Sequence, residues 1–131
     1  MPTISLESHH KNEMIEVTDR VRQAVDKSGI KDGIVHLFTP HTTAAITINE
    51  NADPDVVHDM LTILDRLVPL SGGYRHLEGN SAAHVKSSMF GCSETIPIEN
   101  GQLTLGTWQG VYFCEFDGPR KRQLQIRILP L

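Results

Sequence analysis

The chain has 131 residues, of which 39% are hydrophobic and 21% are charged, so we expect one globular domain over residues 1–131. Its net charge of -4 argues against a broad contact with nucleic acid, which needs a basic surface. No apolar run reaches the roughly 20 residues of a membrane-spanning helix. Two cysteines in no metal-type spacing, and no apolar leader, predict free thiols and a cytoplasmic location.

The N-terminal part of the chain predicts two strands followed by a helix. Residues 2–6 indicate an edge strand, with residues 13–17 as its partner across a turn. Thr18 stands where a helix cap is expected, and Gly29 stands where a glycine ends a helix. The apolar residues between them recur at helical spacing, so we expect this helix to cover a sheet.

A proline-containing corner and a second helix come next. Residues 33–38 and 42–48 are β-branched and apolar, which predicts two strands that meet at Thr39-Pro40-His41. Asp53 can cap a helix, and Pro54 suits its first position. We expect this helix to bury the stripe Val56, Val57, Met60, Leu61, Leu64 and Leu67.

The C-terminal half predicts a loop, a short helix and several strands. Residues 71–79 indicate the loop, and Asn80–Met89 indicates the helix. Asn100-Gly101 stands between two alternating runs and is a strong hairpin signal. Further strands at 110–116 and 123–129 complete what we expect to be an antiparallel meander.

Three histidines are candidates for a functional site. His41, His76 and His84 lie in predicted loops or at element ends, beside small and polar residues. Three imidazoles can bind one zinc-class ion, or can act as acid, base and anion-binding groups near neutral pH. Taken singly, each is better explained as a surface or hydrogen-bonded structural histidine. Taken together, they predict a site.

Carboxylates gather near the start of the second helix. Capping explains Asp53 well but hardly explains Glu50, so we predict that Glu50 is a general acid or base, or the partner of a histidine. Asp55 and Asp59 share a helix face near His58. A solvated face with acidic residues near the helix start explains these three more simply.

Two further regions could contact a ligand. Asn80 and Ser81 begin a helix that also carries Lys86, which is suited to holding an anion, although a capped surface helix explains them equally well. Trp108 lies among glycines and polar residues. A buried core position is its leading interpretation, and stacking on a planar substrate is the alternative. Residues 120–122 form a basic turn that we expect to be solvated.

Several segments, in their order and spacing, resemble the YjbQ-like family. The run Gly-Thr-Trp-Gln, within residues 93–111, looks like that family's signature, and the resemblance spans nearly the whole chain. The segments that carry it are His41-Thr42-Thr43-Ala44-Ala45, Asn49-Glu50-Asn51-Ala52-Asp53-Pro54, His58-Asp59-Met60, His84-Val85-Lys86-Ser87-Ser88 and Gly106-Thr107-Trp108-Gln109-Gly110.

The resemblance implies an α+β fold of antiparallel strands layered with helices, assembled as a homotrimer. It also implies a thiamine-phosphate synthase activity, which joins a pyrimidine pyrophosphate to a thiazole phosphate and is expected to be secondary in this family. The matching positions suggest these site residues: His41, Glu50, Asp53, His58, Asp59, His76, His84 and Lys86.

The leading hypothesis from the sequence is therefore an enzyme with a small phosphorylated substrate. Its predicted roles are catalysis by Glu50, Asp59, His84 and Lys86, substrate binding by Asn80, Ser81 and Trp108, and binding of a divalent zinc or magnesium ion by His41, His76 and His84. One alternative is a non-catalytic module that binds a metal or an anionic metabolite. Another is a purely structural subunit of a trimer.

Overall fold

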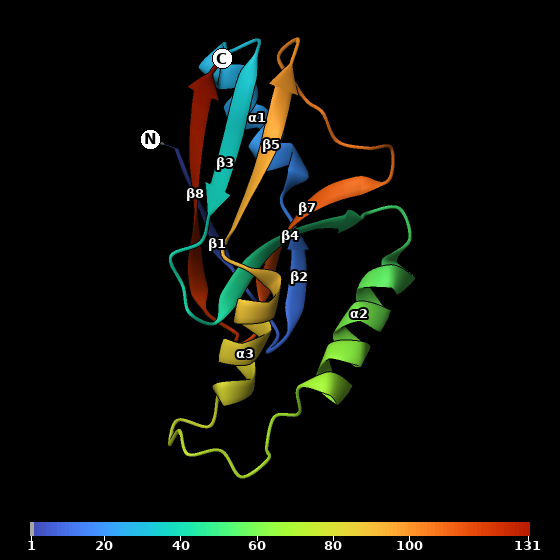
Figure 1. The fold of residues 1–131 in the computed structure, drawn as a ribbon, viewed down its shortest axis with the longest axis vertical. Coiled ribbons are helices and arrows are strands. Elements are labelled where there is room, and N and C mark those ends of the chain that lie inside the picture. Colours follow the sequence, from blue (N-terminus) through green and yellow to red (C-terminus); the bar gives the residue numbers. More distant parts are fainter. Residues whose placement is uncertain (1) are drawn as a thin grey trace.

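Two antiparallel sheets form the centre of the molecule (Figure 1). The computed structural model describes residues 2–131. Within them, the larger sheet has the strand order β1 (Thr3–Glu7), β8 (Lys121–Pro130), β3 (Gly33–Phe38), β5 (Ser93–Glu99) and β6 (Gln102–Leu103). The smaller sheet has the order β2 (Glu13–Glu16), β7 (Gln109–Glu115) and β4 (Ala44–Glu50).

Helices flank both sheets. In the described residues these are α1 (Thr18–Ser28), α2 (Pro54–Leu67) and α3 (Ser81–Phe90). Helix α1 lies behind the larger sheet and packs against β6, β7 and β8, while α3 packs against β4 (Figure 1). Helix α2 stands at the side of the smaller sheet, and a long connection over residues 68–80 joins it to α3 (Figure 1). This arrangement confirms the predicted α+β class.

The main core lies between the two sheets and α1. It contains Val21 and Val25 of α1 together with inward residues of β3, β7 and β8, among them Phe113 and Leu124, which are fully buried. A second, smaller cluster lies between the outer face of the smaller sheet and helices α2 and α3. Alternate residues of β7 serve the two clusters, because successive side chains of a strand point to opposite faces.

Several local signals are confirmed. The side chain of Asp53 caps α2 by accepting a hydrogen bond from the Asp55 N–H at 2.9 Å. Gly29 ends α1 with a φ of 70°. Asn100 and Gly101 both have positive φ, 53° and 75°, in the turn between β5 and β6, as a tight hairpin turn requires.

The predicted cap at Thr18 is wrong. Helix α1 already includes Thr18, and no side chain caps its start. The Thr18 hydroxyl instead accepts a hydrogen bond from the Val111 N–H at 2.8 Å and donates one to Glu16 at 2.9 Å. The hydroxyl therefore ties the start of α1 to β7 and not to its own first turn.

The predicted strand pairing is wrong at both ends of the chain. Strand β1 pairs with β8 and β2 pairs with β7, so the expected partners β1 and β2 lie in different sheets. The expected C-terminal meander also divides, because only β5 and β6 pair as consecutive strands, while β7 joins the smaller sheet. Short connections favour hairpins, but here the longer apolar strands β7 and β8 supply more burial to distant partners.

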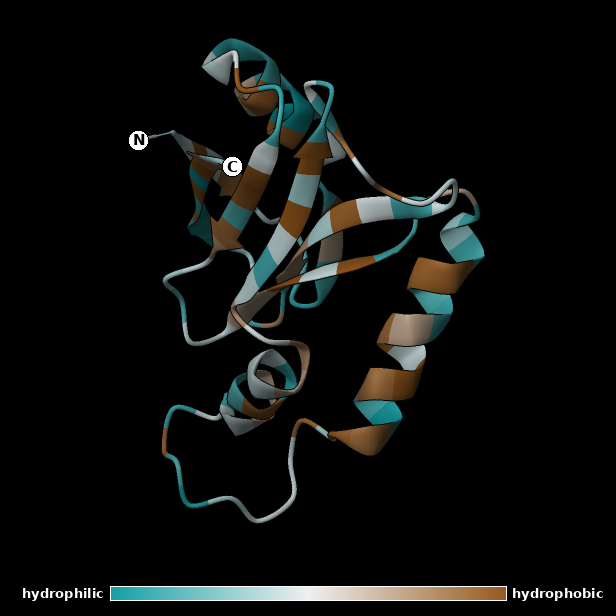
Figure 2. Cartoon of the chain, turned by 45° about the horizontal axis from the view of Figure 1, so that its top comes forward, coloured by the Kyte–Doolittle hydropathy of each residue, from teal (hydrophilic) through white to brown (hydrophobic). Residues whose placement is uncertain are grey.

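The expected buried stripe of α2 is confirmed in part, because Val57, Met60, Leu61 and Leu64 pack in the second cluster. Leu64 is buried, whereas Leu67 at the end of the helix is 67% exposed. Figure 2 shows hydrophobic bands on α2. The remaining apolar residues of the stripe are only partly covered. Among residues 2–131, no helix is both long and apolar enough to span a membrane.

Candidate functional site

The three predicted histidines line one cavity of about 410 Å³, which we call the histidine cavity. His41 comes from the corner between β3 and β4, His76 from the α2–α3 connection, and His84 from the first turns of α3. The other lining residues are Pro40, Thr42, Thr43, Glu78, Asn80, Arg120 and Arg122. Segments that are distant in the sequence therefore meet here.

His76 and His84 lie next to each other in the lining of this cavity. Their ring centroids are 5.6 Å apart and the rings are perpendicular. The Nε2 atom of His76 lies 3.9 Å from a carboxylate oxygen of Glu78. Two imidazoles and a carboxylate in such proximity can exchange protons with a small molecule held beside them.

His41 is held in one ring orientation by the backbone. Its Nε2 atom accepts a hydrogen bond from the Gln123 N–H at 2.9 Å, so the ring proton of the neutral form is on Nδ1. Burial lowers the pKa of His41, and the nearby Arg122 guanidinium lowers it further. His41 thus offers its Nδ1–H as a donor, while its Nε2 lone pair accepts the backbone N–H of Gln123.

A buried ion pair forms the floor of the cavity. Arg122 Nε donates to Glu115 at 2.8 Å, and Nη2 donates to the Thr43 hydroxyl at 2.8 Å and to the Thr43 carbonyl at 3.2 Å. Within residues 2–131, no hydrogen bond is formed by Nη1 of Arg122. That nitrogen can therefore donate to a ligand in the cavity.

Glu115 remains a carboxylate although it is fully buried. Burial acts to raise its pKa, but hydrogen bonds from Arg122, from the Ser8 hydroxyl and from the Asp117 N–H outweigh burial and lower the pKa. The Ser8 bond is 2.6 Å long and links the pair to the end of β1. The negative charge of Glu115 therefore compensates the positive charge of Arg122.

Asp117 positions a second set of cavity residues. Its carboxylate accepts hydrogen bonds from Asn80 Nδ2 at 2.9 Å, from Arg120 Nη2 at 2.9 Å and from Lys11 Nζ at 3.3 Å. Burial acts to raise the pKa of Asp117, and these bonds lower it overall. Among the described residues, the buried Oδ1 atom of Asn80 has no hydrogen-bond partner. It is a free acceptor at the start of α3.

Lys86 and Ser81 lie outside the lining of this cavity. The side chain of Lys86 is only 5% exposed and lines a separate cavity of about 230 Å³. Its Nζ donates to Asp65 at 2.5 Å and to Asn12 at 3.2 Å, and lies 6.0 Å from the centre of the Phe116 ring. Lys86 therefore connects α3 to α2 and to the β1–β2 connection. Ser81 is the half-buried first residue of α3.

Glu50, Asp59 and Trp108 also lie outside the lining of the histidine cavity. Glu50 ends β4, where its carbonyl accepts a hydrogen bond from the Tyr112 hydroxyl at 2.9 Å. Asp59 is exposed on α2, and its Oδ1 atom lies 3.2 Å from Nδ1 of His58. Trp108 is 63% exposed, so the favoured interpretation of a buried core residue is wrong. Its place in the turn before β7 leaves its ring in solvent.

Arg122 and Glu115 were missed by the sequence reasoning. The basic turn was expected to be solvated, but Arg122 is only 6% exposed. A signal was present, because Arg122 is in step with Leu124 and Ile126 along β8, and residues two apart in a strand share a face. An arginine on a core-facing position needs a buried acidic partner, which points to Glu115 on the neighbouring buried segment.

The predicted metal centre is wrong. In residues 2–131, no group of three or more histidine, cysteine, aspartate or glutamate side chains is arranged to hold a metal ion. The geometry gives the reason. The Nε2 lone pair of His41 already accepts the Gln123 N–H, and a metal-ligating imidazole must offer a free lone pair. His76 and His84 alone are too few ligands for a zinc site.

Comparisons with known proteins identify one family. Residues 2–130 match the family described as UPF0047 protein YjbQ-like. The UPF0047 protein YugU of Bacillus subtilis is 49% identical over 130 residues, covering 98% of both chains. A crystal structure of a yjbq/upf0047 family protein from Clostridium acetobutylicum has a TM-score of 0.97 and 53% identity, covering 98% of this chain and 100% of that one.

A structure from Sulfolobus solfataricus, described as a YbjQ-like protein of unknown function, has a TM-score of 0.95 and 34% identity, covering 99% of this chain and 96% of that one. The predicted thiamine-phosphate synthase activity is therefore wrong as an assignment, because the relatives are described as uncharacterised UPF0047 proteins and as a protein of unknown function. The match nonetheless spans nearly the whole chain, and this chain belongs to the YjbQ-like UPF0047 family.

Proposed function

We propose that the histidine cavity binds a small phosphorylated molecule. The observation that carries this proposal is the free Nη1 of the buried Arg122, which lines the cavity while the other nitrogens of the guanidinium are held by Glu115 and Thr43. An arginine whose position is fixed before binding loses little side-chain entropy when it meets a phosphate. Guanidinium N–H groups also match phosphate oxygens in geometry.

The other donors of the cavity surround the same space. His41 offers Nδ1–H, and His76 and His84 offer imidazole groups from the opposite wall. Arg120 is held by Asp117 at the cavity edge. A volume of about 410 Å³ lies in the range of pockets that enclose small metabolites. The cavity therefore suits a phosphate group with a modest organic substituent.

Proton transfer is the chemistry that this arrangement supports. His76 and His84 stand on one side of the proposed phosphate position, with Glu78 beside His76. Imidazoles exchange protons readily near neutral pH. We therefore assign His84 the role of exchanging a proton with the bound molecule, and Arg122 the role of holding its charge.

Calorimetric titration of the purified protein with inorganic phosphate and pyrophosphate tests the proposal. Arg120→Gln and His84→Ala should each weaken binding by about tenfold, the loss expected for a hydrogen bond to a charged group. His58→Ala is the matched control, because His58 is exposed on α2 outside the cavity. Equal affinity in all four proteins, or equal loss in the control, would contradict the assignment.

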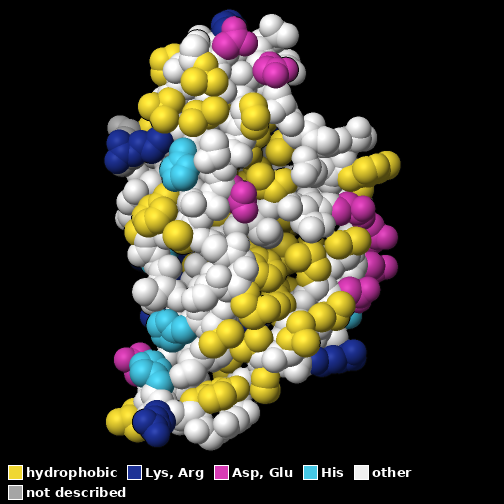
Figure 3. Space-filling view, viewed as in Figure 1, with side chains coloured by type: hydrophobic (Ala, Val, Ile, Leu, Met, Phe, Trp, Pro, Cys, Tyr) yellow, Lys and Arg dark blue, Asp and Glu magenta, His cyan; other side chains and the backbone are white. Residues whose placement is uncertain are grey.

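We also propose that copies of this chain assemble into the homotrimer that the family resemblance implies. Large apolar side chains remain exposed around α2 and α3, and Figure 3 shows hydrophobic side chains gathered on this part of the surface. Such patches support an interface. The exposed residues are Ile63, Leu67, Leu70, Val85 and Met89. Light scattering should give three times the mass of one chain, and a monomeric mass at micromolar concentration would refute assembly.

A cytoplasmic location is a further part of the proposal. Cys92 and Cys114 are both free, and Cys92 is exposed. Free thiols are typical of reducing compartments. Fractionation of cells that produce the protein should recover it with cytoplasmic markers, and recovery with secreted or membrane fractions would overturn this placement.

A further inference from the structure

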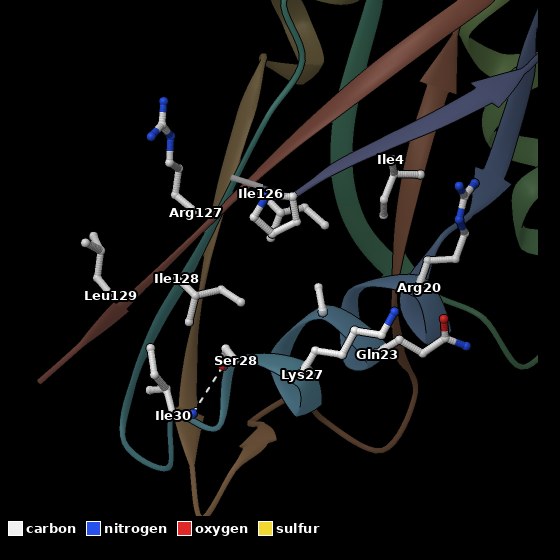
Figure 4. A pocket seen from close by; sticks show the side chains of 12 residues that line it. Ile4, Arg20, Gln23, Lys27, Ser28, Ile30, Ile126, Arg127, Ile128 and Leu129 are labelled. Atoms are coloured by element: carbon white, nitrogen blue, oxygen red, sulfur yellow. Dashed lines mark hydrogen bonds between the residues drawn. The ribbon is translucent and has the colours of Figure 1, made fainter.

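A second cavity, of about 680 Å³, lies between α1 and the C-terminal half of β8 (Figure 4). We call it the α1 groove. Of the residues that line the histidine cavity, none lines this groove. The groove is therefore a separate place on the molecule, and nothing in the proposed phosphate site accounts for it.

The groove opens because two strands differ in length. Strand β1 pairs with β8 only from Lys121 to Gln125, whereas β8 continues to Pro130 along β3. The Ile126 N–H still donates to the Pro2 carbonyl at 3.0 Å, but in residues 2–131 β8 has no further strand neighbour on the β1 side, and α1 lies across the gap (Figure 4). At the base of this gap, Ile4 and Ile126 are buried in the same core cluster as Val21 and Val25 of α1.

The floor of the groove is aliphatic. Ile4 and Ile126 lie at its base and are buried, and its accessible apolar lining comes from the half-buried Ala24, Ile30 and Ile128. Figure 4 shows Ile126 and Ile128 extending from β8 toward α1, while Arg127 points away from the helix. This alternation is the ordinary pattern of a strand. It leaves a groove with a branched apolar surface that water solvates poorly.

The rim of the groove is cationic. Arg20, Gln23 and Lys27 are three and four residues apart, so they share one side of α1, and all three line the groove. No aspartate or glutamate is among the lining residues. Within residues 2–131, neither Arg20 nor Lys27 forms an ion pair, and the guanidinium of Arg20 donates only to the Ser5 carbonyl, at 2.9 Å.

This charge is notable because the whole chain carries a net charge of -4. A cationic row beside an aliphatic floor complements a molecule with an anionic group at one end and a hydrocarbon chain at the other. We propose that the α1 groove binds an amphipathic anion of this kind, such as a medium-chain carboxylate. The hydrocarbon lies along Ala24, Ile30 and Ile128, and the anionic group meets Arg20 and Lys27.

Octanoate is the probe for this proposal, below the concentration at which it forms micelles. Titration followed by amide NMR should perturb residues of α1 and β8. Hexanoate should bind about fifteenfold more weakly, because it has two methylenes fewer and each buried methylene changes affinity by about fourfold. Acetate should not bind measurably, and 1-octanol should bind more weakly than octanoate because it lacks the charge.

Two variants of the same helix separate specific binding from general attraction of anions. Lys27→Glu should weaken octanoate binding by about fivefold, the upper range for one partly exposed ion pair. Arg22→Glu makes the same charge change on α1 outside the groove and should leave the affinity unchanged. Thermal unfolding of both variants checks that the fold is retained.

Four outcomes would overturn the proposal. The first is absence of octanoate binding to the unmodified protein, and the second is an equal loss in Lys27→Glu and Arg22→Glu. The third is a change in assembly mass with Lys27→Glu, because this would show that a second copy of the chain covers the groove. Preferential binding of octanol over octanoate would also refute it, since the cationic row would then play no part.

Discussion

The region formed by the two sheets and α1 differs sharply from the region formed by α2, α3 and the connection between them. In the first, long apolar side chains such as Leu37 and Phe113 are fully buried. In the second, α2 has a single fully buried residue, Leu64, and residues 68–79 are mostly exposed. Regions with few buried contacts open most easily. We therefore expect the region of α2, α3 and their connection to open before the two sheets and α1.

The histidine cavity lies where these two regions meet. Arg122, Glu115 and His41 come from the well-packed region, while His76 and Glu78 come from the exposed connection. The cavity therefore combines charged residues held by the well-packed region with residues of an exposed connection. Binding residues often lie on such connections beside a rigid scaffold.

The largest expected effect on this comparison comes from Glu115→Ala. The change leaves the buried Arg122 without its carboxylate, and breaking a buried pair in this way costs about 3–5 kcal/mol of unfolding free energy. Urea denaturation measures the loss. Glu99→Ala, at an exposed position of β5, should change stability by less than about 0.5 kcal/mol. Similar losses in both variants would mean that the pair does not anchor the floor.

A matched pair of leucines compares the two regions directly. Leu37→Ala in β3 should cost about 2–5 kcal/mol, the range for a fully buried leucine. Leu67→Ala, at a position that is 67% exposed, should change the stability of the isolated chain by less than about 0.5 kcal/mol. Denaturation curves at low protein concentration make this comparison. A large loss at Leu67 would show that α2 is packed more firmly than its exposure indicates.

The cap of α2 offers a smaller effect confined to the loosely packed region. Asp53→Ala removes the hydrogen bond to the Asp55 N–H and should cost about 1 kcal/mol. Hydrogen exchange should increase in α2 and stay unchanged in β3 and β8. If exchange rises equally in the strands, the two regions unfold as one unit.

The smallest expected effect is a dependence of stability on pH through His41. Because its pKa is lowered from the usual 6.5, the unfolded chain takes up this proton more readily, and stability is lost as pH falls from 6.5 through the lowered pKa. In that pH window, the melting temperature of His41→Gln should depend less on pH than that of the unmodified protein. The melting temperature of His58→Ala should keep the pH dependence of the unmodified protein. Below the usual 4.5, the lowered pKa of Glu115 adds a further loss as that carboxylate is protonated. An unchanged profile in His41→Gln would remove His41 from this account.

Part of the fold and of the candidate site could be predicted from local sequence. Asp53 before Pro54, the glycine after α1 and the Asn100-Gly101 turn all act within a few residues of themselves, so their signals are complete in the sequence. The grouping of His41, His76 and His84 was also expected from their surroundings. Their expected use as metal ligands failed, because the backbone N–H that occupies His41 comes from the distant Gln123.

The sequence by itself determined the start of α2, the end of α1 and the turn at Asn100-Gly101, because those choices depend on neighbouring residues. Only the tertiary structure decided which strands pair, that Arg122 is buried against Glu115, and that Leu67 is exposed. These outcomes depend on segments far apart in the chain competing for the same buried surface. Burial is a property of the whole packing, so Arg122 of a basic turn is buried and Leu67 at the end of an apolar stripe is exposed.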